Sequence, residues 1–171
     1  MSVDLLRIDD RLVHGQVVEG WLRSLRVTHV IVASDAVVAN EMQKALYSLA
    51  VPYGVELDCL SIADAGRAWG SAAWDDDHVL VLVSSPEDAY SLLRAGAPIR
   101  SINVGGLHYR EGRVQVLKAV SLDARDIQAL RKLAAEGVAL EARPLPLDEP
   151  VEMTSHLDQW QQTLVGGEQP R

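Results

Sequence analysis

The sequence predicts an α/β protein with an open, mainly parallel twisted sheet and helices on both faces. Short apolar runs with the length of buried strands alternate along the 171 residues with segments whose apolar residues recur at helical spacing. Strands separated by helices need crossover connections, and these give parallel pairing with a helical layer on each face of the sheet. The run His78–Val83 is the most apolar in the chain, which makes it the expected central strand.

Six further runs predict the other strands because they are apolar or rich in β-branched residues. They are Val3–Ile8, Val27–Ala33, Val55–Leu60, Ile99–Val104, Val114–Val120, which fits a strand or part of a hairpin, and Val138–Ala142. Two glycines, Gly105 and Gly106, follow the run that ends at Val104. They fit a plain turn and a close backbone approach to a bound phosphoryl group equally well.

Helices are predicted where capping residues precede an apolar face. They are expected after the first strand, with Val17, Val18, Trp21, Leu22 and Leu25 on one face; after Ser34-Asp35, with Val38, Met42, Ala45, Leu46 and Leu49 on one face and an end before Pro52; from Ile62 towards Ala73, with Trp69 and Trp74 packed near its end; from Ser85-Pro86; from Asp123 to Gly137; and from Glu152 to Leu164. In the last helix Trp160 could contact a partner, but its large apolar area favours packing on the domain.

Composition indicates one cytoplasmic domain over residues 1–165, followed by a flexible tail at residues 166–171. The 16 basic and 24 acidic residues give a net charge of −8, which argues against nucleic acid because phosphate backbones bind basic surfaces. A single cysteine, Cys59, rules out an internal disulfide framework and suits a reducing compartment. No run approaches the roughly 20 apolar residues of a transmembrane helix, and Met1–Asp10 lacks the features of a signal peptide.

The sequence predicts neither a metal site nor a nucleotide cofactor. No spacing of the histidines, Cys59 and the acids resembles a zinc or calcium site, and Asp75–Asp77 fits a solvated turn better than a set of ligands. Glycine-rich nucleotide-binding motifs are absent. His29 and His78 lie at strand starts and are interpreted as structural, whereas His108 could lie near a site beside the glycine pair.

A cluster of charged residues marks the crossing from the first strand to the first helix, at residues 7–17. Open α/β sheets place their ligands at the carboxyl ends of strands, and a helix start adds free amide groups and a partial positive charge. Phosphate suits such a site. The crossing contains Arg7, Arg11, Asp9, Asp10, and His14 followed by Gly15.

His14 is the candidate nucleophile because imidazole is nucleophilic near neutral pH and holds a phosphoryl group in a labile bond. Asp9 or Asp10 could accept a hydrogen bond from one ring nitrogen and leave the other free to attack. Arg7 or Arg11 could neutralise the phosphoryl oxygens. The other interpretation is a structural ion pair beside a packed or solvated histidine, and the residues alone leave it open.

The segment Arg-Ile-Asp-Asp-Arg-Leu-Val-His-Gly-Gln-Val at residues 7–17 resembles an active-site signature. It is similar to that of the IIB component of the mannose/fructose/sorbose family of the bacterial phosphoenolpyruvate-dependent sugar phosphotransferase system. Val30–Asp35, Ser101–Gly106 and Lys118–Leu122 are similar to later blocks of that family, in the same order. The resemblance therefore covers roughly residues 3–143.

The resemblance implies a phosphocarrier enzyme. His14 would accept a phosphoryl group on Nδ1 from a IIA partner and pass it to a sugar that enters through the IIC and IID subunits of a membrane permease. The candidate catalytic residues are His14, Asp9, Asp10 and Arg11, and the candidate phosphate-binding residues are Arg7, Gly15, Gln16, Gly105 and Gly106. Exposed apolar residues around the loop, Leu12 and Val13 among them, are expected to form the docking surface, and the apolar helices could support a homodimer.

Two other functions remain open at this point. The first is a regulatory module of the phosphotransferase system that is phosphorylated on His14 without transporting sugar. The second is a small-molecule binding domain that uses the same anion site for a phosphorylated metabolite without chemistry. The sequence does not name the sugar.

Overall fold

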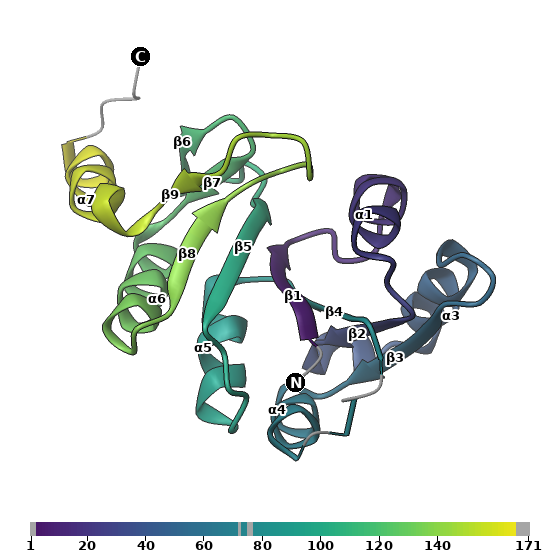
Figure 1. Ribbon diagram of the computed structural model, residues 1–171. Helices are drawn as coiled ribbons and strands as arrows, with labels where there is room; N and C mark the ends of the chain where they lie inside the picture. The colour runs from purple at the N-terminus through teal and green to yellow at the C-terminus, as the bar shows by residue number, and fades with distance from the viewer. Residues whose placement is uncertain (1–2, 72, 75–76, 167–171) are drawn as a thin grey trace.

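A computed structural model describes residues 3–71, 73–74 and 77–166. Within these residues a seven-stranded sheet in the order β3-β2-β4-β1-β5-β8-β9 forms the centre, with a two-stranded hairpin, β6-β7, beside it (Figure 1). The strands are β1 (Val3–Asp9), β2 (His29–Ala33), β3 (Glu56–Leu60), β4 (Val79–Val83), β5 (Ser101–Gly106), β6 (Val114–Leu117), β7 (Val120–Leu122), β8 (Ala139–Ala142) and β9 (Val151–Glu152). Neighbouring strands of the described sheet pair in parallel except β9, which runs antiparallel to β8.

The helices follow the strands in the alternation that the sequence predicts. They are the π-helical η1 (Val17–Leu22), α1 (Arg23–Leu25), α2 (Asp35–Val38), α3 (Glu41–Ala50), α4 (Ile62–Gly70), α5 (Pro86–Arg94), α6 (Ala124–Ala135), the 3-10 turn η2 (Thr154–His156) and α7 (Leu157–Gly166). The predicted caps at Ser34, Ser85 and Asp123 are confirmed, because each side-chain oxygen accepts a hydrogen bond from an amide of the first turn. Within the described residues no helix combines the length and the apolarity of a membrane span.

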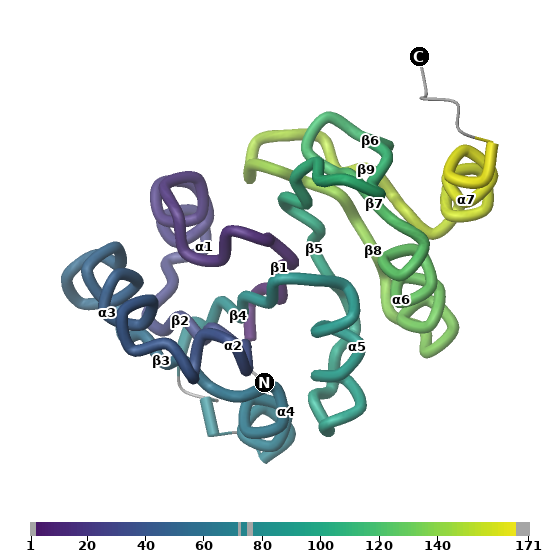
Figure 2. The backbone as a smooth tube through the Cα atoms, turned by 180° about the vertical axis from the view of Figure 1, so that it is seen from behind, coloured from purple at the N-terminus to yellow at the C-terminus, as the bar shows by residue number. Residues whose placement is uncertain are grey.

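Helices cover both faces of the sheet, as predicted. On one face α4, α5, α6 and α7 bury a large apolar core that includes Leu92, Leu130 and Trp160. On the other face η1, α2 and α3 bury a smaller core that includes Val17 and Val37. Figures 1 and 2 show α1 and α3 together at one end of the molecule and α6 and α7 at the other. The strand β4 lies between β2 and β1 with all five residues buried, which confirms it as a central strand.

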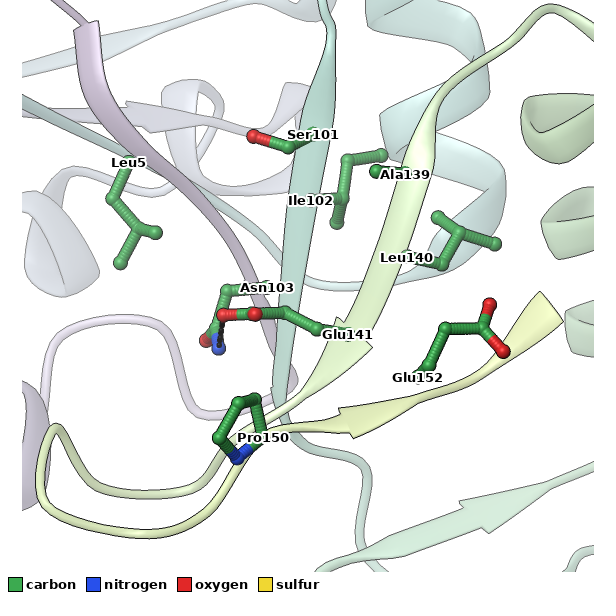
Figure 3. Close-up of a pocket in the computed structure, with 9 residues that line it drawn as sticks. All are labelled: Leu5, Ser101, Ile102, Asn103, Ala139, Leu140, Glu141, Pro150 and Glu152. Carbon is green, nitrogen blue, oxygen red and sulfur yellow. Dashed lines mark hydrogen bonds between the residues drawn. The ribbon is translucent and has the colours of Figure 1, made fainter.

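The second helical layer is incomplete over β5 and β8. A cavity of about 380 Å³ lies on this part of the sheet, lined by Leu5, Ser101, Ile102, Asn103, Ala139, Leu140, Glu141, Pro150 and Glu152 (Figure 3). Asn103 and Glu141 point towards each other from neighbouring strands in this view. The open patch therefore exposes one polar end of a side-chain network that continues towards the carboxyl edge of the sheet.

The prediction of a single helix after Ser34-Asp35 is wrong. Two helices occupy this stretch, because Asn40 has extended backbone angles and its side chain caps α3 by accepting a hydrogen bond from the Gln43 amide. The predicted apolar face is also wrong in part, since Met42, Leu46 and Leu49 are exposed. Tyr47 is the residue of α3 that is buried instead.

The remaining differences lie near the ends of elements. The helix predicted over Glu152–Leu164 is preceded by β9 and a 3-10 turn, and α7 starts only at Leu157. Trp160 is buried and stacks on His156, which confirms packing. Val114–Val120 belongs to the β6-β7 hairpin. Gly166, the first residue of the predicted tail, is the last residue of α7. Residues 167–171 of that tail, and Asp75 and Asp76 of the predicted turn, lie outside the described residues.

Gly137 ends α6 with a φ of +82°, and a Cβ at this position would meet no atom within 4 Å. Gly137→Ala should therefore lower the free energy of unfolding by about 1 kcal/mol through backbone strain alone. Chemical denaturation measures this loss. Gly15→Ala, at a position with equal space and no left-handed backbone, should show no such loss of stability. Equal effects of the two substitutions would contradict the left-handed cap at Gly137.

Candidate functional site

The loop after β1 is held by its own apolar residues. Beyond Asp9 the chain turns sharply, and the Leu12 amide donates a hydrogen bond to the Asp9 carbonyl at 2.9 Å. Leu12 adopts a left-handed conformation with a φ of 56°, which is strained for a residue with a side chain. Leu12 and Val13 are both buried. The expectation that they form an exposed docking surface is therefore wrong, because they anchor the loop to the smaller core.

His14 lies between this turn and the helix. Its carbonyl oxygen accepts a hydrogen bond from the Val18 amide at 3.0 Å, so it starts the helical segment that continues into η1. The side chain is 13 % exposed and thus partly accessible from the carboxyl edge of the sheet. Gly15 has no left-handed backbone, and a Cβ there would meet nothing within 4 Å, so the left-handed residue of this loop is Leu12 and not the glycine.

Asp9 is the residue that contacts the ring. Its buried Oδ2 lies 2.9 Å from Nε2 of His14 and 3.0 Å from Nη2 of Arg7, and its Oδ1 accepts the Arg11 amide at 3.2 Å. Burial raises the pKa of Asp9, but the hydrogen bond from His14 and the charge of Arg7 outweigh it and hold the pKa below its usual value. An ionised carboxylate only accepts hydrogen bonds, so Nε2 of His14 is the donor, and in the neutral ring the lone pair then lies on Nδ1. Among the described residues Nδ1 has no hydrogen-bond partner.

Arg7 lies beneath Asp9 and is fully buried. Besides Asp9, its guanidinium donates to Oδ1 of Asn103 at 2.7 Å and to the carbonyl oxygens of Arg143 and Pro144 at 3.1 Å. The ring of Trp21 lies 5.3 Å from the guanidinium carbon. This geometry directs Arg7 at the carboxylate rather than at solvent.

Arg11 and Gln16 form the exposed side of the loop. The Arg11 side chain is 43 % exposed, and its Nε lies 3.9 Å from Oδ1 of Asp9. Its Nη2 donates a hydrogen bond to Oε1 of Gln16 at 3.1 Å. Both side chains line a cavity of about 650 Å³ together with the glycine pair of β5 and His108. Arg11 is thus the arginine of the motif that an incoming anion can reach.

The Asp10 side chain contacts His108 and Arg113. Its Oδ1 lies 2.6 Å from Nδ1 of His108, and its Oδ2 accepts the His108 amide at 2.8 Å. Nη1 of the buried Arg113 lies 3.5 Å from Oδ2 of Asp10, and its Nε donates a hydrogen bond to Asp126, which completes the capping box of Asp123 at the start of α6. Asp10 therefore ties the loop after β5 to the loop after β1, and His108 lies at the edge of the site as the sequence suggested.

Gly105 and Gly106 belong to β5 itself, so the turn interpretation is wrong. A Cβ at Gly105 would lie 1.7 Å from Cζ of Arg7, and a Cβ at Gly106 would lie 3.3 Å from the Asp9 carboxylate oxygens. The missing side chain at Gly105 is what gives the buried guanidinium its space. In the part of the chain that the structure describes, no group of three or more His, Cys, Asp or Glu residues could hold a metal ion.

The family model of the PTS system sorbose subfamily IIB component matches residues 3–165. The chain belongs to this family of phosphotransferase-system IIB components. It is 35 % identical to the sorbose-specific EIIB component of Klebsiella pneumoniae, over 93 % of this chain and 97 % of that protein. The crystal structure of the IIBSor domain of the sorbose permease from Klebsiella pneumoniae superposes with a TM-score of 0.86, at 34 % identity, and covers 93 % of this chain and 98 % of that one.

Other relatives of this IIB chain carry different sugar names. This chain is 39 % identical to the mannose-specific EIIAB component of Escherichia coli (strain K12), over 90 % of this chain but 47 % of that protein. The chain therefore spans about half the length of that relative. The fructose-specific EIIB component of Bacillus subtilis (strain 168) is 36 % identical over 86 % of this chain and 91 % of that protein.

Sequence reasoning missed Asn103 and Trp21, whose side chains contact Arg7. A signal for Asn103 exists, since it is an amide inside the otherwise apolar run Ile102–Val104. No comparable signal marks Trp21, because a tryptophan on a helical apolar face is expected to pack in any case.

Asp9→Asn tests the ion pair through the pH dependence of stability. The substitution leaves the buried Arg7 unpaired, so it should lower the free energy of unfolding by about 3 kcal/mol at pH 7. The pKa of Asp9 in the folded protein is below its unfolded value of about 3.9. The contribution of Asp9 to the free energy of unfolding is therefore fully present above the unfolded pKa and is lost as the pH falls through the folded pKa.

Urea unfolding of wild type and Asp9→Asn between pH 7 and pH 2.5 measures this contribution. The difference in the free energy of unfolding between the two proteins should shrink below about pH 4. Asp158→Asn, in an exposed pair with Arg131, is the control and should change stability by less than about 0.5 kcal/mol. A difference that stays constant across the whole range would contradict a depressed pKa at Asp9.

Proposed function

We propose that this IIB chain is a phosphocarrier that moves a phosphoryl group through His14. The donor is a phosphorylated IIA protein, and the acceptor is a sugar that enters through a IIC and IID permease at the cytoplasmic side of the membrane. Family membership supports both partners. The observation that carries the proposal is the ring geometry, with Nε2 held by the buried Asp9 carboxylate and Nδ1 without a partner among the described residues.

The first transfer follows from this geometry. The Nδ1 lone pair of His14 attacks the phosphorus atom on the donor imidazole, a new N–P bond forms, and the bond to the donor breaks. The His14 ring becomes positively charged as the bond forms, and the proton stays on Nε2. Asp9 stabilises that charge at 2.9 Å, in the way that an aspartate orients and stabilises the histidine of a hydrolase triad.

In the second transfer Nδ1 of His14 is the leaving group instead of the nucleophile. A sugar hydroxyl attacks the phosphorus, the N–P bond breaks with its electron pair returning to Nδ1, and the hydroxyl proton leaves to solvent. Arg11, with its exposed guanidinium oriented by Gln16, is the proposed contact for the phosphoryl oxygens in both steps. The amide of Gly15, at the helix start, is a further proposed donor.

Removal of the nucleophile tests the carrier directly. His14→Ala should fold normally, since it removes a partly exposed ring, and should take up no phosphoryl group from phosphorylated IIA. Intact-mass spectrometry detects the acid-labile adduct of about 80 Da that wild type should carry. His78→Ala is the matched control, because His78 is an exposed histidine at the opposite edge of the sheet and should leave labelling unchanged. Labelling that persists in His14→Ala would move the phosphorylated residue elsewhere.

The surface that receives the partners is proposed to lie on the loops around the site. Tyr109, in the loop after β5, and Leu145, in the loop after β8, are exposed apolar residues that line the same cavity as Arg11. The fully exposed Leu147 lies in the same loop as Leu145. These residues take the place of Leu12 and Val13, which are buried. Large exposed apolar side chains beside a reactive group are typical of a docking surface.

A pair of leucine substitutions tests this surface. Leu147→Glu should raise the KM for phosphorylated IIA about tenfold and leave kcat unchanged, because it affects encounter and not chemistry. Leu49→Glu, at a similarly exposed leucine on α3, should leave KM unchanged because α3 lies at the far end of the sheet from the β6-β7 hairpin (Figure 1). The reverse result would assign docking to α3.

A further inference from the structure

The Asp9 carboxylate has to be fixed in position for the His14 ring to present Nδ1. One oxygen, Oδ2, is shared between Nε2 of His14 and Nη2 of Arg7, at 2.9 and 3.0 Å. The Asp9 side chain is fully buried. The orientation of the Asp9 side chain is therefore determined by protein groups, and the hydrogen bond from Arg7 is a strong one because it joins two full charges.

Arg7 is itself held by groups that leave it no second position. Two backbone carbonyls, from Arg143 and Pro144, and the amide oxygen of Asn103 accept from its terminal nitrogens. Among the described residues its Nε has no partner, so the guanidinium already lacks one hydrogen bond in the native state. A buried cation in that condition is tolerated only where its other contacts are strong.

Asn103 is oriented from its other end. Its Nδ2 donates to the Arg143 carbonyl at 3.2 Å and lies 3.4 Å from Oε1 of Glu141, the contact seen in the open cavity over β5 and β8 (Figure 3). With the amide nitrogen engaged in this way, Oδ1 is the atom that faces Arg7. The network thus starts on the open face of the sheet and ends at the catalytic ring.

Gly105 makes the arrangement sterically feasible. An added Cβ would lie 1.7 Å from Cζ and 2.0 and 2.1 Å from the two terminal nitrogens of Arg7. Because the guanidinium is enclosed by the Trp21 ring and by backbone carbonyls, it cannot move aside without breaking these contacts. A side chain at position 105 would therefore displace the group that orients Asp9.

We propose that Asn103, Arg7 and Gly105 are positioning residues for the phosphocarrier reaction. They hold Asp9 so that the His14 ring stays in one tautomer, with the proton on Nε2 and the lone pair on Nδ1. Arg7 acts through the carboxylate and not on the phosphoryl group, since it is fully buried. The effect of these residues on phosphoryl transfer rests on the proposed function, but their effect on the tautomer of the His14 ring does not.

Two readouts test the proposal on the full chain. The ¹⁵N chemical shifts of labelled histidine report the His14 tautomer without any partner, with His29, His78, His108 and His156 as internal references. Phosphoryl uptake from phosphorylated IIA gives kcat and KM. Asn103→Leu and Gly105→Ala should convert His14 from one tautomer to a mixture and lower kcat roughly 10-fold or more, with little change in KM.

Three comparisons separate positioning from a general loss of stability. Asn103→Asp keeps the acceptor for Arg7 and should retain more activity than Asn103→Leu. Gly105→Ala should cost little further rate when added to Arg7→Lys, because both changes act through one guanidinium. Gly137→Ala, which strains a distant helix end, should change neither the tautomer nor kcat.

The proposal is overturned if folded Asn103→Leu keeps a single His14 tautomer and the wild-type kcat, and this variant decides the matter should Gly105→Ala fail to fold. Additive effects of Gly105→Ala and Arg7→Lys would overturn the role given to Gly105. A tautomer change in these variants, together with a wild-type chain that takes up no phosphoryl group, would support the positioning network and contradict the phosphocarrier function.

Discussion

A buried pair of opposite charges, the Arg7 guanidinium and the Asp9 carboxylate 3.0 Å apart, is the contact on which the carboxyl edge of the sheet depends. Removing both charges from water costs several kcal/mol per ion, so the pair requires compensating hydrogen bonds at its remaining positions. Asn103, two backbone carbonyls and the His14 ring provide them. The reactive imidazole is thereby attached to the interior of the sheet, although it lies in a loop.

The sequence is sufficient to predict the fold where local chemistry and hydrophobic pattern agree. Ser85 followed by Pro86 starts a helix, Asp123 caps another, and Gly137 ends it, since each residue acts on the backbone next to it. The apolar residues of the run at positions 78–83 form the interior strand Val79–Val83, which is buried on both faces. The location of His14 at a strand end follows from the same patterns.

What the sequence could not predict depends on residues that meet only in the folded chain. Gly105 lies nearly one hundred positions from Arg7, and nothing local distinguishes a glycine in a turn from a glycine that makes room for a distant guanidinium. The left-handed backbone at Leu12 is stabilised by burial and not by residue type. On α3 the hydrophobic period was correct for a helix, but the buried side is set by the neighbouring strands, which receive Tyr47 instead.

The empty space at Gly105 also has an evolutionary consequence. A descendant that acquires a larger residue there cannot retain the arginine in its present place, and one that loses the arginine first no longer benefits from the glycine. The two positions lie nearly one hundred residues apart along the chain, yet we expect selection to act on them together because they share one space in the fold. Related lineages should therefore inherit both residues or neither.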